Sequence, residues 1–285
     1  MTDSNKTNQS VKAILLGSGD RRPKILSEIE RLRPLISEIV EIVGEDFSYE
    51  EDLSNCEADI AIVLGGDGSI LRAAKQMGRH QIPVLGLNLG KLGFLADIHP
   101  DEIVEALQNV VNGNYQLVNH LMIRCQIFRG DKLVSDEIGL NEIAILGGPP
   151  FDIQQIDLYV DDEHATSYLC DGLIISTPIG STAHNLSAGG PILRKNLQAF
   201  VISPISPHTL TVRPVVDTAD RTYEIVVSKP NGSTCAVLDG QVLSPITEND
   251  RVHICRAEPV FQMVQVAGNS YYRMLREKLG WSGKF

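Results

Sequence analysis

The chain has 285 residues, of which 43% are hydrophobic and 21% are charged, and its formal net charge is −11. This length accommodates one large domain or two of ordinary size, with enough apolar side chains for a packed core. The excess of negative charge argues against a nucleic-acid partner, since such proteins need basic surfaces to neutralise phosphates. The five cysteines form no C-x-x-C pair, and no apolar run has the length of a membrane span. The first ten residues are polar, so no secretory signal is expected. We therefore expect a cytoplasmic protein with reduced thiols and no membrane contact.

The first hundred residues alternate between strand-like and helix-like patterns. Continuous apolar runs at Val11–Leu16, Ala58–Leu64 and Ile82–Asn88 predict strands that are covered on both faces. Apolar residues at helical spacing predict helices over residues 23–40 and Ser69–Met77. Strands that alternate with helices indicate a parallel, Rossmann-like α/β sheet, whose ligand edge lies at the carboxyl ends of the strands.

The pattern changes near residue 100. A helix is expected from about Asp101 to Val111, directly after Pro100. Beyond it, short segments rich in Val, Ile and Thr are separated by turn residues, which is typical of an antiparallel β domain. The segment Asn269–Trp281 again has helical spacing, and we expect it to pack back on the first domain. The prediction is an α/β domain formed by residues 1–100 plus about 267–285, and a β-rich domain formed by residues 101–266.

The segment Leu64–Arg72, LGGDGSILR, places one carboxylate among three glycines at the predicted end of a strand. No complete Walker A loop, dinucleotide fingerprint or nucleophile elbow occurs at the glycine-rich turns. Gly65, Gly66 and Gly68 lack a Cβ, so a phosphate chain can lie against their backbone N–H groups at the start of the next helix. Asp67 can then hold Mg²⁺ or accept a proton from a hydroxyl group beside the phosphate. The alternative is an ordinary strand-to-helix turn in which Asp67 caps the helix.

Three further segments carry polar groups that suit a ligand. Asn88–Asp97, NLGKLGFLAD, is a second glycine-rich segment and follows the next predicted strand directly. Asn141 and Glu142 are adjacent polar residues in an otherwise apolar strand, for which the alternative is an edge strand with one wet face. Cys170–Leu193 joins a strand to a loop dense in Gly, Ser and Thr, which offers many hydrogen-bond donors with little steric bulk. Such a loop suits ribose, amide and phosphate groups.

These motifs occur in the order and at the separations found in NAD kinases. Over roughly residues 60 to 245 the chain resembles that family in GGDG, NLGKLGFL, LNE, DGLIISTPIGSTA, LSAGGP, SPISPHTL and DGQ. The closing KLGW at Lys278–Trp281 is similar to bacterial members. The GGDG turn alone is less specific, because 6-phosphofructokinases and diacylglycerol or sphingosine kinases are similar there.

The resemblance implies a fold and an activity. The fold is an α/β domain that carries GGDG, followed by a β-rich NAD-binding domain. The activity is transfer of the γ-phosphoryl group of ATP to the 2′-hydroxyl of the adenosine ribose of NAD, which gives NADP. The resemblance also implies a divalent metal ion, most simply Mg²⁺, and assembly as a homodimer or homotetramer.

Individual residues receive roles from the same resemblance. Asp67 corresponds to the proton acceptor for the ribose hydroxyl, and Gly68 contacts NAD beside it. Asn141 and Glu142 bind the nucleoside part, and Asp171 holds a base or amide group. The other NAD-binding positions come from one loop and one turn: Thr182, Ala183, His184, Asn185, Leu186, Ser187 and Gln241. Gly65, Gly66 and Gly68 are expected to bind phosphate or ATP, and no side chain is assigned as a metal ligand.

Two positions depart from the family pattern. His184 stands where many members have Tyr, and Leu169 stands where some bacterial members have a basic residue. The position of Leu169 is associated with preference for NAD⁺ over NADH, so the oxidation state of the acceptor stays open, as does the choice between ATP and polyphosphate. Lys91 is a candidate ATP contact. His208 and Arg213 lie in a Pro-rich segment that we interpret as a sharp connection between strands rather than a phosphate site.

Two other functions are consistent with a GGDG turn. One is a lipid or sugar kinase, but this acidic chain shows no segment suited to a membrane surface. The other is a non-catalytic NAD(P)-binding sensor. The presence of Asp67 counts against a sensor, because a sensor needs no carboxylate at the reacting hydroxyl. We therefore predict a NAD kinase.

Overall fold

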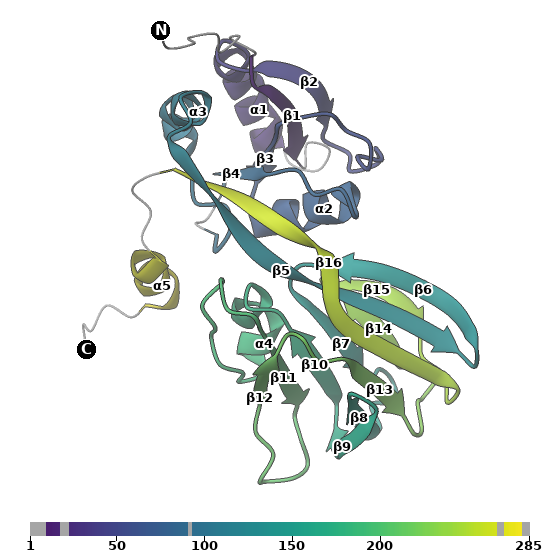
Figure 1. Ribbon diagram of the computed structural model, residues 1–285. Coiled ribbons are helices and arrows are strands. Elements are labelled where there is room, and N and C mark those ends of the chain that lie inside the picture. Colours follow the sequence, from purple (N-terminus) through teal and green to yellow (C-terminus); the bar gives the residue numbers. More distant parts are fainter. Residues whose placement is uncertain (1–9, 18–22, 91–92, 267–270, 281–285) are drawn as a thin grey trace, which may run out of the picture. The chain divides into compact units, whose positions relative to one another are not determined.

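A computed structural model of the chain describes residues 10–17, 23–90, 93–266 and 271–280 (Figure 1). The chain divides into two compact units, one formed by Met1–Val118 with Gln262–Phe285 and the other by Asn119–Phe261. The divisions predicted from the sequence, at residue 100 and about residue 267, differ from these bounds. The first difference arises because the helix after residue 100 packs into the core of the first unit, through Ile103, Ala106, Leu107 and Val110.

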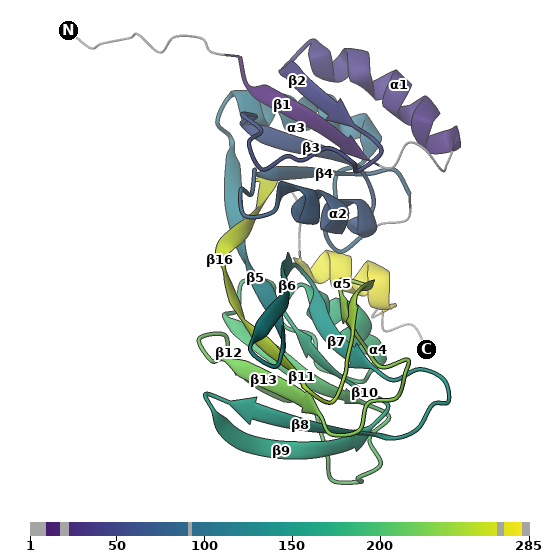
Figure 2. The same cartoon turned by 90° about the vertical axis from the view of Figure 1, so that its right-hand side faces the viewer.

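The first unit is built on a parallel sheet. Its strands are, in spatial order, β2 (Glu41–Asp46), β1 (Lys12–Gly17), β3 (Ile60–Gly65) and β4 (Val84–Asn88). Its helices are α1 (Pro23–Ser37), α2 (Asp67–Met77), the 3₁₀ turn η1 (Pro100–Glu102), α3 (Ile103–Val111) and α5 (Tyr271–Leu279). Figure 2 shows α1 and α2 on opposite sides of these strands. The strands are therefore covered on both faces, which explains why β3 and β4 are buried along their whole length.

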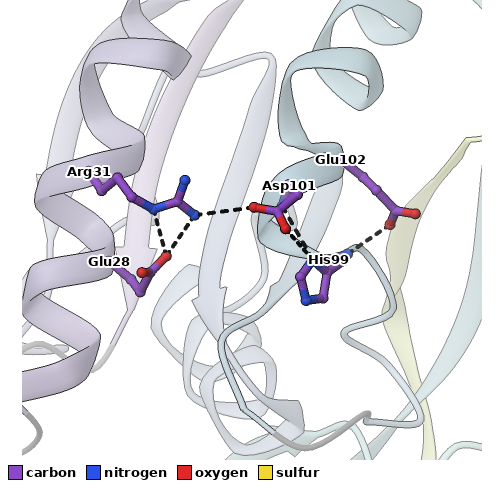
Figure 3. Close-up of polar contacts among 5 residues, drawn as sticks. All are labelled: Glu28, Arg31, His99, Asp101 and Glu102. Atoms are coloured by element: carbon purple, nitrogen blue, oxygen red, sulfur yellow. Dashed lines mark hydrogen bonds and ion pairs between the residues drawn. The ribbon is translucent and has the colours of Figure 1, made fainter.

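A surface network fixes the start of η1 (Figure 3). The Nδ1 atom of His99 accepts the backbone N–H of Asp101 at 3.4 Å, and the backbone N–H of His99 donates to Glu102 at 3.0 Å. These two bonds form a capping box that satisfies helix-start donors. Arg31 of α1 pairs with Glu28 at 2.8 Å and approaches Asp101 at 3.7 Å. Because these groups are exposed, the pairs contribute little stability and serve mainly to connect α1 with η1.

The second unit consists of β-sheets. One sheet has the order β12 (Val215–Thr218), β11 (Ala199–Ile205), β10 (Gly172–Ser176), β7 (Glu142–Leu146), β14 (Cys235–Leu238) and β15 (Gln241–Pro245), and every neighbouring pair is antiparallel. The other strands of this unit are β5 (Tyr115–Arg129), β6 (Lys132–Gly139), β8 (Gln154–Val160), β9 (Glu163–Cys170), β13 (Tyr223–Val227) and β16 (Asp250–Val266). Strands β5 and β16 each include residues of both units.

A large apolar core joins the strands of the second unit. Ile143, Ile175 and Phe200 come from the six-stranded sheet, and Ile123 and Tyr223 come from the other strands. The predicted combination of an α/β unit and a β-rich unit is confirmed. None of the helices in the described part of the chain has the length and apolar character to cross a membrane.

The predicted loop at residues 182–187 is more ordered than its composition indicates. It contains the 3₁₀ turn η2 (Gly180–Thr182) and the short helix α4 (His184–Ser187). Ser181 stabilises this segment by donating through its hydroxyl to the Pro178 carbonyl at 2.6 Å and by accepting the backbone N–H of Leu193 at 3.0 Å.

Candidate functional site

In the first unit, the GGDG motif forms the turn from β3 into α2. Gly66 is the residue before the helix, and Asp67 is its first residue, but the side chain of Asp67 does not cap the helix. Instead, its Oδ2 accepts the backbone N–H of Phe94 at 2.7 Å, and its Oδ1 accepts those of Leu95 at 2.8 Å and Ala96 at 3.1 Å. The interpretation of Asp67 as a helix cap is therefore wrong. Its carboxylate is held by the second glycine-rich segment.

The glycines of this region have different reasons to be glycine. A Cβ at Gly93 would overlap the Oδ1 atom of Asp67, and a Cβ at Gly65 would overlap the Ser69 hydroxyl. These two glycines are thus required by packing within the protein. At Gly66 and Gly68, by contrast, no described atom beyond the adjoining residues and the backbone of α2 lies within 4 Å of an added Cβ. The backbone at Gly66 and Gly68 is open to a ligand, at the positive end of the dipole of α2.

Neighbouring parallel strands explain why the two glycine-rich segments meet. Gly65 pairs with Asn88, so β3 and β4 end at the same level of the sheet. The backbone N–H of Leu89 donates to the Gly65 carbonyl at 3.0 Å, and the Asn88 side chain accepts the N–H of Gly90 at 2.9 Å. Lys278 of α5 lies 5.5 Å from the centre of the Phe94 ring, so α5 also reaches this turn. Lys91 lies outside the described residues.

In the second unit, Asn141 and Glu142 lie at the start of β7. This strand pairs with β10 on one side and β14 on the other, so the edge-strand interpretation is wrong. Glu142 is only 6% exposed. Its carboxyl group accepts the backbone N–H of His184, while Oε2 has no partner among the described residues. Burial, with the nearby carboxylate of Asp239 as a second cause, raises the pKa of Glu142 to about 8.

Asp239 is the residue at this site that the sequence analysis missed. Its Oδ2 accepts the backbone N–H of Leu140 at 2.8 Å, and its Oδ1 accepts those of Asn141 at 2.7 Å and Glu142 at 3.2 Å. The backbone N–H of Asp239 donates in return to the Glu142 carbonyl at 3.0 Å. The signal for Asp239 in the sequence is the DGQ motif, of which only Gln241 was predicted to bind NAD. Gln241 begins β15 and is exposed.

The Ser- and Thr-rich segment holds the same turn from another direction. The Thr177 hydroxyl donates to the Leu140 carbonyl at 2.6 Å, and its backbone N–H donates to the Asn141 carbonyl at 2.8 Å. A Cβ at Gly180 would overlap that Asn141 carbonyl, so only glycine allows this approach. The motifs LNE, TPIG and DGQ therefore come together around Leu140–Glu142. We call these three residues, with Thr177, Gly180, His184 and Asp239, the Glu142 cluster.

The predicted residues of the 182–187 segment are placed differently. The His184 amide contacts Glu142 directly, whereas Ser187 is exposed and Thr182, Ala183 and Leu186 are half-buried. Asn185 is fully buried, and its amide nitrogen donates to the Ser181 and Pro191 carbonyls at 3.0 and 3.1 Å. Its Oδ1 accepts the Ser203 hydroxyl at 2.7 Å. The hydrogen bonds of the buried Asn185 side chain therefore stabilise the 182–187 segment.

Asp171 is not brought to the Glu142 cluster within this unit. Glu142 pairs with Ser176, whereas Leu146, at the far end of β7, pairs with Gly172. Asp171 is therefore about 16 Å from Glu142 along the strand direction, at the usual rise per residue. Leu169 is exposed in β9. Arg213 donates to the carbonyls of Leu210 and Val212 in its own loop, as expected for a residue that fixes a connection.

The described residues do not form a metal site from side chains alone. No group of three or more His, Cys, Asp or Glu residues among them is arranged to hold a metal ion. Asp67 fits a metal poorly, because its two oxygens already accept three backbone N–H groups. A divalent ion is therefore not assigned to protein ligands.

Comparison with known proteins identifies the family. Residues 38–115 match the model of the ATP-NAD kinase N-terminal domain, and residues 140–266 match that of the ATP-NAD kinase C-terminal domain. The NAD kinase of Rhodopirellula baltica is 52% identical over 273 residues, which cover 96% of this chain and 88% of that protein. The chain belongs to the NAD kinase family. The first match contains the Asp67 turn and the second contains the Glu142 cluster, and the predicted family is confirmed.

Other members support the assignment. The NAD kinase of Photobacterium profundum is 41% identical over 229 residues, which cover 80% of this chain and 78% of that protein. An NAD kinase from Archaeoglobus fulgidus, solved in complex with ATP, superposes with a TM-score of 0.71 at 26% identity, over 95% of this chain and 98% of that chain. Yeast NADH kinase, solved with NADH, has a TM-score of 0.86 at 21% identity, over 100% of this chain and 94% of that chain, which shows the shared fold.

Proposed function

We propose that the chain transfers the γ-phosphoryl group of ATP to the 2′-hydroxyl of the adenosine ribose of NAD, with Asp67 as acceptor of the hydroxyl proton. The hydrogen-bond count at Asp67 carries this proposal. A carboxylate has about four lone-pair sites. The described residues fill three of them, two on Oδ1 and one on Oδ2. The position left on Oδ2 suits one hydroxyl donor.

This arrangement fits the demands of phosphoryl transfer. The reaction depends on in-line positioning and charge stabilisation more than on a strong base, because its transition state is loose. Little bonding to the nucleophile has formed in such a state, so the hydroxyl proton leaves late. A carboxylate fixed by three amides both orients the hydroxyl group and receives its proton.

We also propose a binding site for the phosphates of ATP at the start of α2. Gly66 and Gly68 present open backbone at the start of α2, where N–H groups lack partners within the helix. Gly65 contributes by allowing the close approach of Ser69. A divalent ion would be bound through the phosphates, which is the usual mode for Mg²⁺.

For the acceptor, we propose that Asn141 and Glu142 bind the nucleoside. The free Oε2 of Glu142 is the group best suited to a ribose hydroxyl. Direct contacts of NAD with Asp171 and Gln241 stay predictions, as do those with Thr182, Ala183, His184, Leu186 and Ser187. Homo-oligomeric assembly and a cytoplasmic location are likewise predictions.

Asp67→Asn tests the role of the carboxylate, and Asp46→Asn is a matched control. Asp46 ends β2, the edge strand of the same sheet, and its carboxylate also accepts three backbone N–H groups, from Ser48, Tyr49 and Glu51 at 2.7 to 3.0 Å. Each substitution weakens a comparable set of three hydrogen bonds from backbone amides, but only Asp67→Asn removes the proposed proton acceptor. We expect Asp67→Asn to lower kcat by about 10² to 10⁴-fold with NAD still bound. Asp46→Asn should lower stability and leave kcat within a few-fold.

The assay measures phosphorylation of NAD⁺ and NADH with ATP or polyphosphate, and diacylglycerol serves as an alternative acceptor. Turnover of Asp67→Asn within a few-fold of the wild type would reject the assigned role. Phosphorylation of diacylglycerol but not NAD by the wild type would replace the proposed function with a lipid kinase.

A further inference from the structure

The Glu142 cluster contains two acidic residues with different surroundings. Asp239 is saturated with donors, since three consecutive amides, those of Leu140, Asn141 and Glu142, point at its carboxylate. Glu142 has the opposite character, because it is 6% exposed and its Oε2 has no partner among the described residues. A buried oxygen without a partner is costly, so the Oε2 of Glu142 calls for a ligand, a functional role or a bound water molecule.

The backbone connects these two acids directly. The Glu142 N–H donates to Asp239 and the Asp239 N–H donates to the Glu142 carbonyl, so both peptide groups of Glu142 are fixed by Asp239. Glycine provides the space, because a Cβ at Gly139 would lie 2.6 Å from Leu238 and 3.1 Å from Asp239 Oδ2. A displacement of Asp239 would therefore also move the backbone of Glu142, and with it the Glu142 side chain.

Charge connects them as well. The titratable residues that face Glu142 in this unit are Asp239, on the turn between β14 and β15, and His184, on α4. His184 approaches through its backbone N–H, and β10 contributes Ser176, which is not titratable, as the paired residue. Among these groups, only Asp239 opposes ionisation of Glu142, and in a buried site this repulsion is weakly screened.

We propose that Asp239 is a positioning residue for NAD binding: it fixes the Leu140–Glu142 turn through three backbone amides, and its negative charge acts on the Glu142 carboxyl group that receives a ribose hydroxyl. This inference rests on the proposed function only in that NAD is the ligand of Glu142. It predicts two separable effects of Asp239, one geometric and one electrostatic.

The variants Asp239→Asn and Asp239→Ala separate the two effects. Asn removes the charge and retains an Oδ1 acceptor for the Asn141 and Glu142 amides, whereas Ala removes all three bonds. Asp161→Asn is the matched control, since Asp161 has the same left-handed backbone (φ 48° against 49° for Asp239) and accepts the Thr222 N–H at 2.9 Å. Asp161 lies on the β8–β9 turn, where it pairs with Arg221 rather than an acid.

NAD binding to each full-length protein is measured by calorimetry without a donor, from pH 6 to pH 9.5. For the wild type, affinity should rise with pH through a midpoint near 8, because the ionised carboxylate accepts hydroxyl hydrogen bonds. In Asp239→Asn the midpoint should fall by about one pH unit or more, since one of two negative charges is gone. At the highest pH, where Glu142 is ionised throughout, Kd should be raised several-fold in Asp239→Asn and about tenfold or more in Asp239→Ala. Asp161→Asn should match the wild type.

An unchanged midpoint in a folded Asp239→Asn protein would overturn the inference. If that variant does not fold, Glu142→Gln decides, because retention of the midpoint in Glu142→Gln would show that another group titrates. Steady-state assays distinguish the proposals: the inference predicts an effect on KM with little change in kcat. A wild type that binds NAD with this pH dependence but does not phosphorylate it would reject the proposed function and leave the inference standing.

Discussion

Replacing Glu142 by Gln should make the ligand-free protein more stable. Burial and Asp239 raise the pKa of this carboxyl group from 4.5 to about 8, so the folded chain binds the proton more tightly than the unfolded chain. The contribution of Glu142 to the free energy of unfolding is therefore fully present below pH 4.5 and is lost as pH rises toward 8. The loss is about 1.36 kcal/mol per pH unit, which amounts to about 3 kcal/mol at pH 7 and about 5 kcal/mol above pH 8.

Gln is the appropriate replacement because it has the shape of the protonated acid and does not titrate. Urea unfolding of both proteins, followed by circular dichroism between pH 5 and pH 8.5, measures the difference in the free energy of unfolding. We expect a small difference at pH 5 that grows to about 3 kcal/mol in favour of Gln at pH 7. A difference that does not change with pH would show that Glu142 titrates normally in the folded chain, and would refute the reasoning.

The same variant should bind NAD more weakly, because it lacks the carboxylate that we propose receives the ribose hydroxyl. A gain in stability combined with a loss of affinity is the expected signature of a residue kept for function. If Glu142→Gln bound NAD as well as the wild type, the unpartnered Oε2 would have no role in binding.

Two further variants test other parts of the structure. Gly68→Ala should stabilise α2 by roughly 0.5–1 kcal/mol, because no described atom obstructs the methyl group, yet it should lower kcat/KM for ATP at least tenfold by blocking the open backbone; unimpaired kinetics with ATP would contradict a phosphate site there. His120 is 3% exposed beside the Lys195 carbonyl, and burial lowers its pKa from 6.5 to about 4. Its contribution to stability is therefore present above pH 6.5 and lost as pH falls toward 4, by up to about 3 kcal/mol. Urea unfolding of His120→Gln should lack that acid-dependent loss, and an identical pH profile would disprove it.

Strands with continuous apolar sequence were predictable, and strands with mixed sequence were not. β1, β3 and β4 are buried on both faces of a parallel sheet, so their sequences contain almost no polar residues. β2 was missed because Glu41–Asp46 is the edge strand of that sheet and carries three acidic residues in EIVGED. An edge strand has one neighbour and partial exposure, so its pattern resembles that of a loop.

The positions of chemically important residues were predictable where several motifs agreed, but their contacts were not. Asp67 was selected because glycines surround it, whereas its bonds to residues 94–96 depend on backbone amides, which carry no sequence signal. Glu142 was assigned to an exposed strand as one alternative, because buried acids are rare. Its burial depends on β10 and β14, which pair with β7 from distant parts of the sequence.

The same arrangement occurs at both sites: a glycine is followed by three residues whose backbone amides donate to one carboxylate. Gly93 is followed by Phe94, Leu95 and Ala96, whose amides all donate to Asp67. Gly139 is followed by Leu140, Asn141 and Glu142, whose amides all donate to Asp239. A Cβ at Gly93 would overlap Asp67 Oδ1, and a Cβ at Gly139 would clash with Leu238 and lie 3.1 Å from Asp239 Oδ2.

The GFLA and GLNE segments are thus equivalent as carboxylate cradles, and what differs is the surroundings of each acid. The described residues fill three positions on Asp67, which leaves Oδ2 able to accept a substrate hydroxyl. Asp239 instead faces a second, buried acid, so its charge acts on Glu142 rather than on a reacting atom. In the proposed roles, the same arrangement holds a proton acceptor in one unit and a positioning residue in the other. Gly93 should tolerate no side chain, because a Cβ there would overlap Asp67, whereas a Cβ at Gly139 would first meet the side chain of Leu238.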